Sequence, residues 1–412
     1  MSETRCPPPL DPAQAGDTSE PDIEPFLRLV LAGGRAGPRR TLLERAGSPA
    51  AALAQGDAAW RAAWLDENQR AALRRPDEEA MAASLRWIAQ PGRTVIGWHD
   101  PEYPALLRRT ASPPLALFVH GDPALLWQPA VAVVGSRSPT PAGRDNTVGF
   151  VRALVQAGMT VASGLAAGID TVAHATALAA SGPTYAVLGT GPDIAYPRGN
   201  GALQDGIAAA GALVSEHPPG TGPRKEHFPS RNRILAGLTL GTLVVEAAGR
   251  SGALITARLA AESGREVFAV PGSIHNPLVR GCHRLIRDGA TLVEDIEQVL
   301  AGLSPVAQTL ASALRDRLTV PTTGGGPIAP GRPPPATSAT TRAATTPTPP
   351  GLSSYCDRPD HQRLWSSLEL HVQQDGGHFG GRQSASLDQL IHRTGVRPEG
   401  RPQALVVGLV AI

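Results

Sequence analysis

The run Ala130–Ser136, AVAVVGS, has the pattern that best indicates the class of the fold. It is continuously apolar, without alternating polar residues, and it ends in a Gly-Ser turn. Such a run is typical of a strand that is buried on both faces of a parallel sheet. Six runs of the same texture follow it: MTVASGL (159–165), TYAVLGTG (184–191), ALVSEH (212–217), GTLVVEAA (241–248), EVFAVPGS (266–273) and ATLVE (290–294).

Amphipathic stretches with helical spacing lie between these runs. Examples are AGIDTVAHATALAAS (167–181) and SGALITARLAAESG (251–264). Strands that alternate with helices form right-handed βαβ units. The sequence therefore predicts an α/β fold with a doubly wound parallel sheet across residues 130–300.

The flanking segments have other compositions. Residues 1–20 are polar and contain proline, so we expect a disordered N-terminus. Residues 21–97 have a helical pattern that includes a helix–turn–helix at LAGGRAGPRRTLLERAG (31–47), and we expect a small helical domain there. A Pro-rich connector follows, with a strand expected at Leu115–His120.

We expect the chain to lose regular secondary structure after Leu303. Residues 321–350 hold nine Pro and eight Thr with no acidic residue, so we expect a flexible linker over residues 303–358. Residues 359–412 regain a helical pattern in QRLWSSLELH and SLDQLIHRTGV. The latter is similar to the first helix and turn of a helix-turn-helix.

Composition narrows the class of partner. The 412 residues carry a net charge of only +2, so an anionic partner must be met by a local cluster of charge. Three distant cysteines give neither a disulfide framework nor a CxxC metal site. No apolar run reaches membrane-spanning length, and the N-terminus has no secretory pattern. We expect a cytoplasmic protein with no membrane contact, metal or cofactor.

Small residues end several of the predicted strands. Gly135-Ser136-Arg137, Gly164 to Gly168, Gly189-Thr190-Gly191 and Pro271-Gly272-Ser273 all follow buried runs. In an open parallel sheet these ends meet at one rim, where backbone N–H groups can approach an anion. The sequence therefore predicts a phosphate-binding rim, although turns between strands and helices also use glycine for geometry alone.

The sequence motifs disfavour a common nucleotide cofactor as the source of the phosphate that this rim would bind. The first turn reads GSRSPT (135–140) and lacks the GxGxxG pattern of dinucleotide-binding proteins. A GxxxxGK[ST] motif is absent, because the only lysine is Lys225. NAD and ATP are both disfavoured.

A basic segment surrounds Lys225. Residues 224–233, RKEHFPSRNR, hold four cations and one carboxylate, with Phe228 among them. Cations neutralise the phosphates of a single strand, and an aromatic ring stacks on an unpaired base. The alternative is a solvated basic loop that Phe228 anchors to the core, and the segment by itself leaves both interpretations open.

No residue points clearly to catalysis. His174 has the setting of a packed histidine on an amphipathic helix. Glu246 and Asp170 stand where capping and buried hydrogen bonds account for them. We therefore expect no catalytic residue.

An ordered set of motifs resembles the DNA processing protein A (DprA, or Smf) family. The motifs cover about residues 98–300: VAVVGSRSPT, ASGLAAGIDTVAHATAL, AVLGTGPDIAYPRGN, SEHPPG, FPSRNRILAGL, VVEAAGRSGALITARLA, VFAVPGS and GCHRLIRDGA. The resemblance implies an extended Rossmann-like domain over residues 98–302. It also implies a homodimeric, non-enzymatic bacterial recombination mediator, which binds and protects single-stranded DNA and loads the RecA recombinase during natural transformation.

The resemblance also implies site residues. It assigns phosphate or base contacts to Arg137, a phosphate contact to Lys225 and base stacking to Phe228, and this favours the DNA interpretation of the basic segment. The remaining candidates would line or close the same nucleic-acid site: Ser136, Gly164, Gly168, Arg231, Asn232, Arg233, Ser251, Gly252 and Thr256.

Two other functions remain open on the sequence. Related Rossmann-like hydrolases of nucleotide N-glycosidic bonds carry a PGGxGTxxE loop, whereas residues 238–246 read LTLGTLVVE and keep only the Gly-Thr and the Glu. A pure RecA scaffold is the other possibility. Beyond the motifs, the C-terminal segment 359–412 is expected to be an incomplete winged-helix-like segment, because Gly400, Pro402 and Gly408 interrupt the expected recognition helix.

Overall fold

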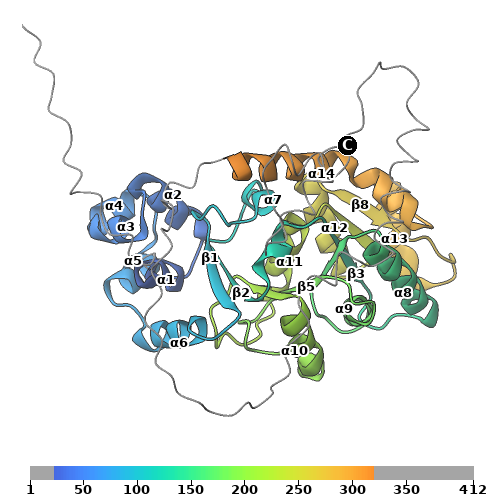
Figure 1. Ribbon diagram of the computed structural model, residues 1–412, viewed down its shortest axis with the longest axis horizontal. Coiled ribbons are helices and arrows are strands. Elements are labelled where there is room, and N and C mark those ends of the chain that lie inside the picture. Colours follow the sequence, from blue (N-terminus) through green and yellow to red (C-terminus); the bar gives the residue numbers. More distant parts are fainter. Residues whose placement is uncertain (1–22, 320–412) are drawn as a thin grey trace, which may run out of the picture. The chain divides into compact units, whose positions relative to one another are not determined.

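The computed structural model describes residues 23–319 of the chain. In that range, one nine-stranded sheet has the order β1-β2-β6-β5-β4-β3-β7-β8-β9 (Figure 1). Strands β3 to β9 are parallel, and β2 pairs antiparallel with β1 and β6. The doubly wound, mostly parallel, Rossmann-like sheet expected from the sequence is confirmed.

Each predicted buried run contains a strand. The strands are β1 (Arg93–Gly97), β2 (Ala116–Gly121), β3 (Ala130–Gly135), β4 (Thr160–Ser163), β5 (Thr184–Leu188), β6 (Ala212–Ser215), β7 (Gly241–Glu246), β8 (Glu266–Ala269) and β9 (Thr291–Leu292). Every residue of β4, β5, β6 and β7 is buried, because helices cover both faces. This burial explains why the runs show no polar alternation.

The helices of the sheet fall into two sets. They are α8 (Pro141–Gln156), α9 (Ile169–Ala179), α10 (Gly201–Ala210), α11 (His227–Leu238), α12 (Ala253–Glu262) and α13 (Arg280–Arg287). Helix α9 packs on α8 and α10, and α11 packs on α12. Because parallel crossovers are right-handed, the reversal of strand order after β6 places α8–α10 on one face and α11–α13 on the other.

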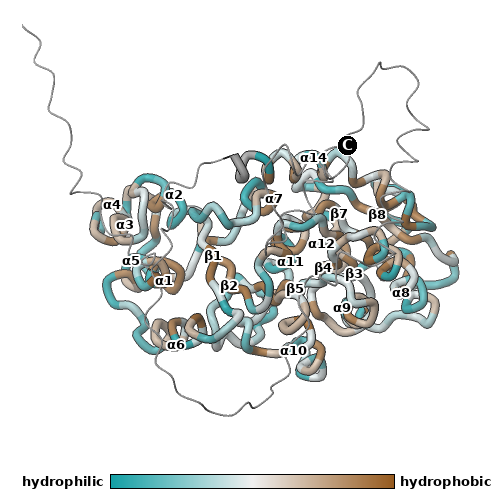
Figure 2. The backbone as a smooth tube through the Cα atoms, in the orientation of Figure 1, coloured by the Kyte–Doolittle hydropathy of each residue, from teal (hydrophilic) through white to brown (hydrophobic). Residues whose placement is uncertain are grey.

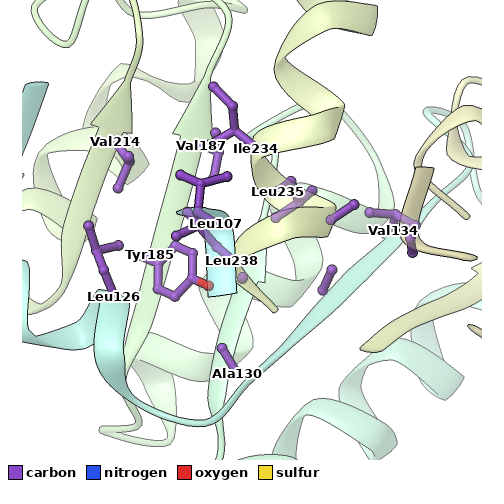
Figure 3. Packing of buried hydrophobic residues seen from close by; sticks show 14 of the residues in the cluster. Leu107, Leu126, Ala130, Val134, Tyr185, Val187, Val214, Ile234, Leu235 and Leu238 are labelled. Atoms are coloured by element: carbon purple, nitrogen blue, oxygen red, sulfur yellow. The ribbon is translucent and has the colours of Figure 1, made fainter. Parts of the chain in front are cut away.

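Helix α11 packs against the sheet through an apolar face. Ile234, Leu235 and Leu238 are almost fully buried and belong to the same core cluster as Val187 and Tyr185 of β5. Figure 3 shows these α11 side chains facing the strands. The helix is therefore fixed in position, with its first turn beyond the carboxyl end of β5.

Six short helices precede the sheet. They are α1 (Ile23–Leu31), α2 (Ala36–Ala46), α3 (Pro49–Ala54), α4 (Gly56–Ala62), α5 (Glu67–Arg74) and α6 (Glu78–Ile88). Their hydrophobic residues, coloured brown along the tube in Figure 2, form one buried cluster with Leu115, Ala116 and Phe118 on and beside β2. The expected helix–turn–helix is present as α1 and α2, and the domain boundary near residue 97 stays a prediction.

Helix α14 (Ile296–Thr319) differs from the expectation. Residues 303–319 were assigned to the linker, yet they are helical. Leu303, Val306 and Leu310 are buried and lie at helical spacing. Burial of this apolar stripe stabilises the helix beyond residue 303. The expected disorder of 1–20, the linker beyond residue 319 and the winged-helix-like segment 359–412 lie outside the described residues.

None of the helices within residues 23–319 has both the length and the apolar character to cross a bilayer.

Candidate nucleic-acid interface

The turn after β3 and the loop after β4 form the centre of the rim. Ile169 donates its backbone N–H to the carbonyl of Ser136 (3.0 Å) at the start of α9. Gly168 has a φ of +86°, and a Cβ there would lie 2.6 Å from the carbonyl carbon of Arg137. Only glycine allows this close approach, so the two loops meet as the sequence predicts.

Arg231 supports the loop after β4 through hydrogen bonds from its side chain. Its buried guanidinium extends from α11, and Nη1 donates to the carbonyl of Gly164 (2.7 Å) and to that of Val187. A Cβ on Gly164 would lie 2.6 Å from Cζ of Arg231, so the glycine makes room for the guanidinium. Burial lowers the pKa of Arg231 to about 10, which still leaves it charged at neutral pH.

Asp170 holds the other side of the same loop. Its buried carboxylate accepts hydrogen bonds from the backbone N–H groups of Gly164 (3.1 Å) and Ala166 (3.3 Å). Burial raises the pKa of Asp170, and the nearby Arg231 opposes that shift. The loop is thus fixed by a buried cation and a buried carboxyl group, as expected for a structural role of Asp170.

The basic segment supplies the exposed charge. Arg224 and Lys225 are exposed in the loop just before α11, and Arg137 is exposed on the turn after β3. Across residues 23–319, no carboxylate lies within ion-pair distance of these three cations. They can therefore meet an external anion without breaking a protein ion pair.

Phe228 is one half of an aromatic pair. Its ring lies 5.0 Å from that of Tyr196, at an angle of 36° between the planes. The ring also covers Gly189, where a Cβ would lie 3.0 Å from Cδ1 of Phe228. Phe228 is half-buried and Tyr196 is 44% exposed, so the pair offers an aromatic surface beside Lys225.

The sequence analysis did not single out Tyr196. The available signal was an aromatic residue in the loop after β5, in a chain that has only four tyrosines. Sequence alone does not place that loop against the first turn of α11. The contact is secured by His227, whose Nδ1 lies 3.1 Å from the carbonyl oxygen of Gly189.

Other candidate residues are less accessible. Arg233 pairs with Glu216 just past β6, which neutralises its charge within the protein. Asn232 and Thr256 are buried, and Ser136 is buried with its Oγ accepting from the backbone N–H of Ser138 (3.2 Å). The loop before α12 is more open, with Gly252 exposed and Ser251 half-buried. The structure thus brings the predicted residues to one rim but presents only some of them to solvent.

Glu246 fills the crevice between β3 and β7, where the strand order reverses. Its buried carboxylate accepts from the backbone N–H (2.9 Å) and Oγ1 (2.8 Å) of Thr140 and from Nδ2 of Asn276 (3.2 Å). Doubly wound proteins often bind nucleotides at this point. Here the carboxylate instead ties the start of α8 to β7, which agrees with the expected structural role.

His174 is likewise a packed residue. It is fully buried, and its Nδ1 lies 2.8 Å from Oγ1 of Thr184, which donates to the carbonyl of Val161. Burial lowers the pKa of His174 to about 3. In the part of the chain that the structure describes, no group of three His, Cys, Asp or Glu side chains is placed to hold a metal ion.

Comparison with known proteins shows which family the chain that forms this rim is related to. The family model described as DNA recombination-mediator protein A matches residues 94–304. The chain belongs to this family. The match includes all twelve candidate residues and confirms the family resemblance of the sequence motifs.

Individual members of the recombination-mediator family show the same relationship. The chain is 48% identical to DNA processing protein DprA of Streptococcus pneumoniae over 202 residues, which cover 49% of this chain and 71% of the relative. It is 46% identical to protein Smf of Escherichia coli over 226 residues, which cover 55% and 60%. The solved structure of the Streptococcus pneumoniae protein has a TM-score of 0.61 at 36% identity and covers 67% of this chain and 97% of its own.

Proposed function

We propose that this protein is a recombination mediator that binds single-stranded DNA along the rim of its sheet. The observation that carries the proposal is the set of exposed cations at the rim, which have no ion-pair partner within residues 23–319: Arg137 on the turn after β3, and Arg224 and Lys225 directly before Phe228 of the Phe228–Tyr196 aromatic pair. Cations that follow a phosphate backbone and rings that stack on bases are the two parts of a single-strand site. Membership of a DNA recombination-mediator family supports the same function.

The candidate residues divide into two roles in this proposal. Arg137, Lys225 and Phe228 contact the strand, and the open loop at Ser251 and Gly252 lies beside it. The buried or paired candidates support the site: Ser136, Gly164, Gly168, Arg231, Asn232, Arg233 and Thr256. Arg231 holds the Gly164 loop and has no need to reach a phosphate.

The larger biological role follows from the family. We propose that the protein acts as a cytoplasmic homodimer in natural transformation, where it protects incoming single strands and loads RecA onto them. A mediator of this kind performs no chemistry on its DNA. The alternative N-glycosidic hydrolase is not favoured, because Glu246, the carboxylate of its expected loop, is buried and accepts hydrogen bonds from Thr140 and Asn276.

Fluorescence anisotropy of a labelled oligothymidine across a salt series tests the DNA site. Lys225→Ala removes one phosphate contact, so the slope of log affinity against log salt should fall by about 0.7. Phe228→Leu keeps the packing on Gly189 but removes the aromatic face, and it should weaken binding by about 1–3 kcal/mol with the slope unchanged. Arg152→Ala, an exposed arginine near the C-terminal end of α8 and away from the rim, is the matched control.

Weak binding that neither variant changes would overturn the proposal. Incubation with nucleoside monophosphates then tests the hydrolase, whose product is free base. If the rim does bind DNA, RecA loading is measured as filament formation on strands that are already covered by a single-strand-binding protein. Variants that lose DNA binding should lose this loading as well.

A further inference from the structure

A cationic cavity lies between α2, one of the N-terminal helices α1–α6 (the helical layer), and the segment that joins β1 to β2. It has a volume of about 310 Å³ and is lined by α2 on one side and by Trp98 and the segment from α7 (Ala105–Arg108) to Pro113 on the other. Two arginines, Arg40 and Arg108, project into its lining. None of the site residues expected from the sequence belongs to it.

The two guanidinium groups are held in place by backbone oxygens. Arg40 Nη1 donates to the carbonyl of Pro113 (2.9 Å), and Arg108 donates through Nη1 and Nη2 to the carbonyls of Trp98 and Asp100. Both also lie over the indole ring of Trp98, at 5.8 and 5.5 Å from its centroid. Neutral acceptors and an aromatic ring orient these cations without removing their charge.

Carboxylates act on these two charges only at longer range, Glu44 on Arg40 and Asp100 on Arg108. Within residues 23–319, no carboxylate lies within ion-pair distance of Arg40 or Arg108, although Glu44 is in the same lining. Burial lowers the pKa of both arginines, because a cation that is partly removed from water is less stable than the neutral form. The buried Nε1–H of Trp98 has no acceptor either.

These donors suit a phosphate group better than a base. Arginine N–H groups are donors only, and a phosphate oxygen accepts from several donors at once. The guanidinium groups already lie over Trp98, so its ring is not an open surface for stacking. The small volume admits one or two phosphate groups rather than a folded macromolecule.

The cavity also lies near the proposed DNA path. Helix α7, which carries Arg108, packs against α11, where a Cβ on Gly237 would lie 2.8 Å from Cδ1 of Leu107. Arg233 ends the basic segment, within about two helical turns of the start of α11, and its charge helps to lower the pKa of Arg40. A strand that leaves the rim along α11 would therefore come to the cavity next.

We propose that the cavity lined by Arg40, Arg108 and Trp98 binds a backbone phosphate of the same single strand, as a second contact beyond the rim. The proposal rests on the DNA-binding function proposed above. It gives the helical layer a direct part in holding DNA and predicts that strands long enough to reach both places bind more tightly.

Two measurements on the full chain test the cavity. In anisotropy with an oligothymidine of about 30 nucleotides, Arg40→Ala should lower the salt slope by about 0.7, and Arg40→Lys, which keeps the charge, should retain the slope. Arg45→Ala, an exposed arginine of the same helix outside the lining, is the matched control. In spectra of protein labelled with ¹⁵N-tryptophan, the strand should shift the indole N–H signal of Trp98, which Trp98→Phe assigns.

The outcomes separate the cavity from the rim. If Lys225→Ala lowers the salt slope while Arg40→Ala and the Trp98 signal do not respond, the cavity proposal is overturned and the rim stands. If inorganic phosphate shifts the Trp98 signal and the strand does not, the cavity takes a free anion and the assignment to DNA is wrong. If the oligothymidine does not bind at all, both proposals fail.

Discussion

At the scale of single residues, Gly168 fixes how closely the two central loops of the rim approach. Gly168→Ala places a Cβ against Ser136 and Arg137 at a φ of +86°. We expect a loss of about 2–4 kcal/mol in the free energy of unfolding, about 1 from the backbone and the rest from the overlap. Urea unfolding measures the change.

Gly220→Ala is the control for this substitution. Gly220 has a φ of +81°, but a Cβ there would meet no atom within 4 Å. It should therefore cost only the backbone share, about 1 kcal/mol. Equal losses in the two variants would show that the loop contact has no part in the effect.

His174 should make stability depend on pH. Its pKa is about 3 in the folded protein, against 6.5 for an unburied histidine, so the unfolded chain binds more protons between these values. The folded state is therefore destabilised as pH falls below about 6.5. From pH 7 to 5 the contribution of His174 is about 2 kcal/mol.

The measurement compares wild type with His174→Gln. Glutamine does not titrate and can still donate to Thr184, so the variant should lose less stability between pH 7 and 5. The difference between the two losses is the quantity to measure by urea unfolding. If both proteins lose the same amount, His174 does not control the acid side of the stability curve.

Arg231 and Lys225 show that the sequence predicts the charge of a segment but not which of its side chains are exposed. Both are cations of the same ten-residue segment, and both were expected at the DNA site. The segment is basic by composition, but helical rotation decides which side chain points where. Arg231 lies on the side of α11 that faces the sheet and becomes a buried support, whereas Lys225 precedes the helix and is exposed.

At the scale of elements, Glu246 joins the end of β7 to the start of α8. Glu246→Gln replaces one carboxylate oxygen by a donor, so one of the N–H or O–H groups from Thr140 and Asn276 loses its acceptor. An unsatisfied buried group costs about 1–3 kcal/mol, and we expect that loss in stability. Chemical unfolding measures it.

The matched control is Glu262→Gln. Glu262 is a solvent-exposed residue of α12, and among residues 23–319 its one ion-pair partner is Arg258, one turn earlier. Its substitution should change stability by less than about 0.5 kcal/mol. A similar small change for Glu246→Gln would contradict the role of this carboxylate as the tie between the two elements.

Helix α11 shows why elements were predicted better than contacts. The buried runs on either side of it made a crossover helix necessary, and its apolar residues were visible in the sequence. The meeting of its Phe228 with Tyr196 was not visible, because it depends on the path of the loop after β5. Loop paths are set by many weak contacts at once, which no local pattern encodes.

At the scale of the molecule, the helical layer and the sheet share a core. Phe118 of β2 is fully buried among the helices and lies edge-on to Trp87, with ring centroids 5.9 Å apart. We therefore expect one cooperative unfolding transition for both parts. Transitions followed by tryptophan fluorescence and by far-ultraviolet circular dichroism should coincide.

Two variants sharpen this prediction. Phe118→Ala lies next to the helices and Phe268→Ala lies in β8, and both side chains are fully buried. Each should lower the stability measured by either probe by about 3–5 kcal/mol. A Phe268→Ala transition that splits in two would mean that the helical layer unfolds by itself.

The class of the fold, the rim at which the strands end and the basic character of residues 224–233 could all be predicted from the sequence. Continuous apolar runs, small residues at strand ends and local charge are all properties of neighbouring residues, so they can be read along the chain. Only the tertiary structure decided that Arg231 is buried, that Tyr196 joins Phe228 and that Arg40 and Arg108 meet at Trp98. These contacts join segments that are far apart in the chain, and packing of the whole molecule brings them together.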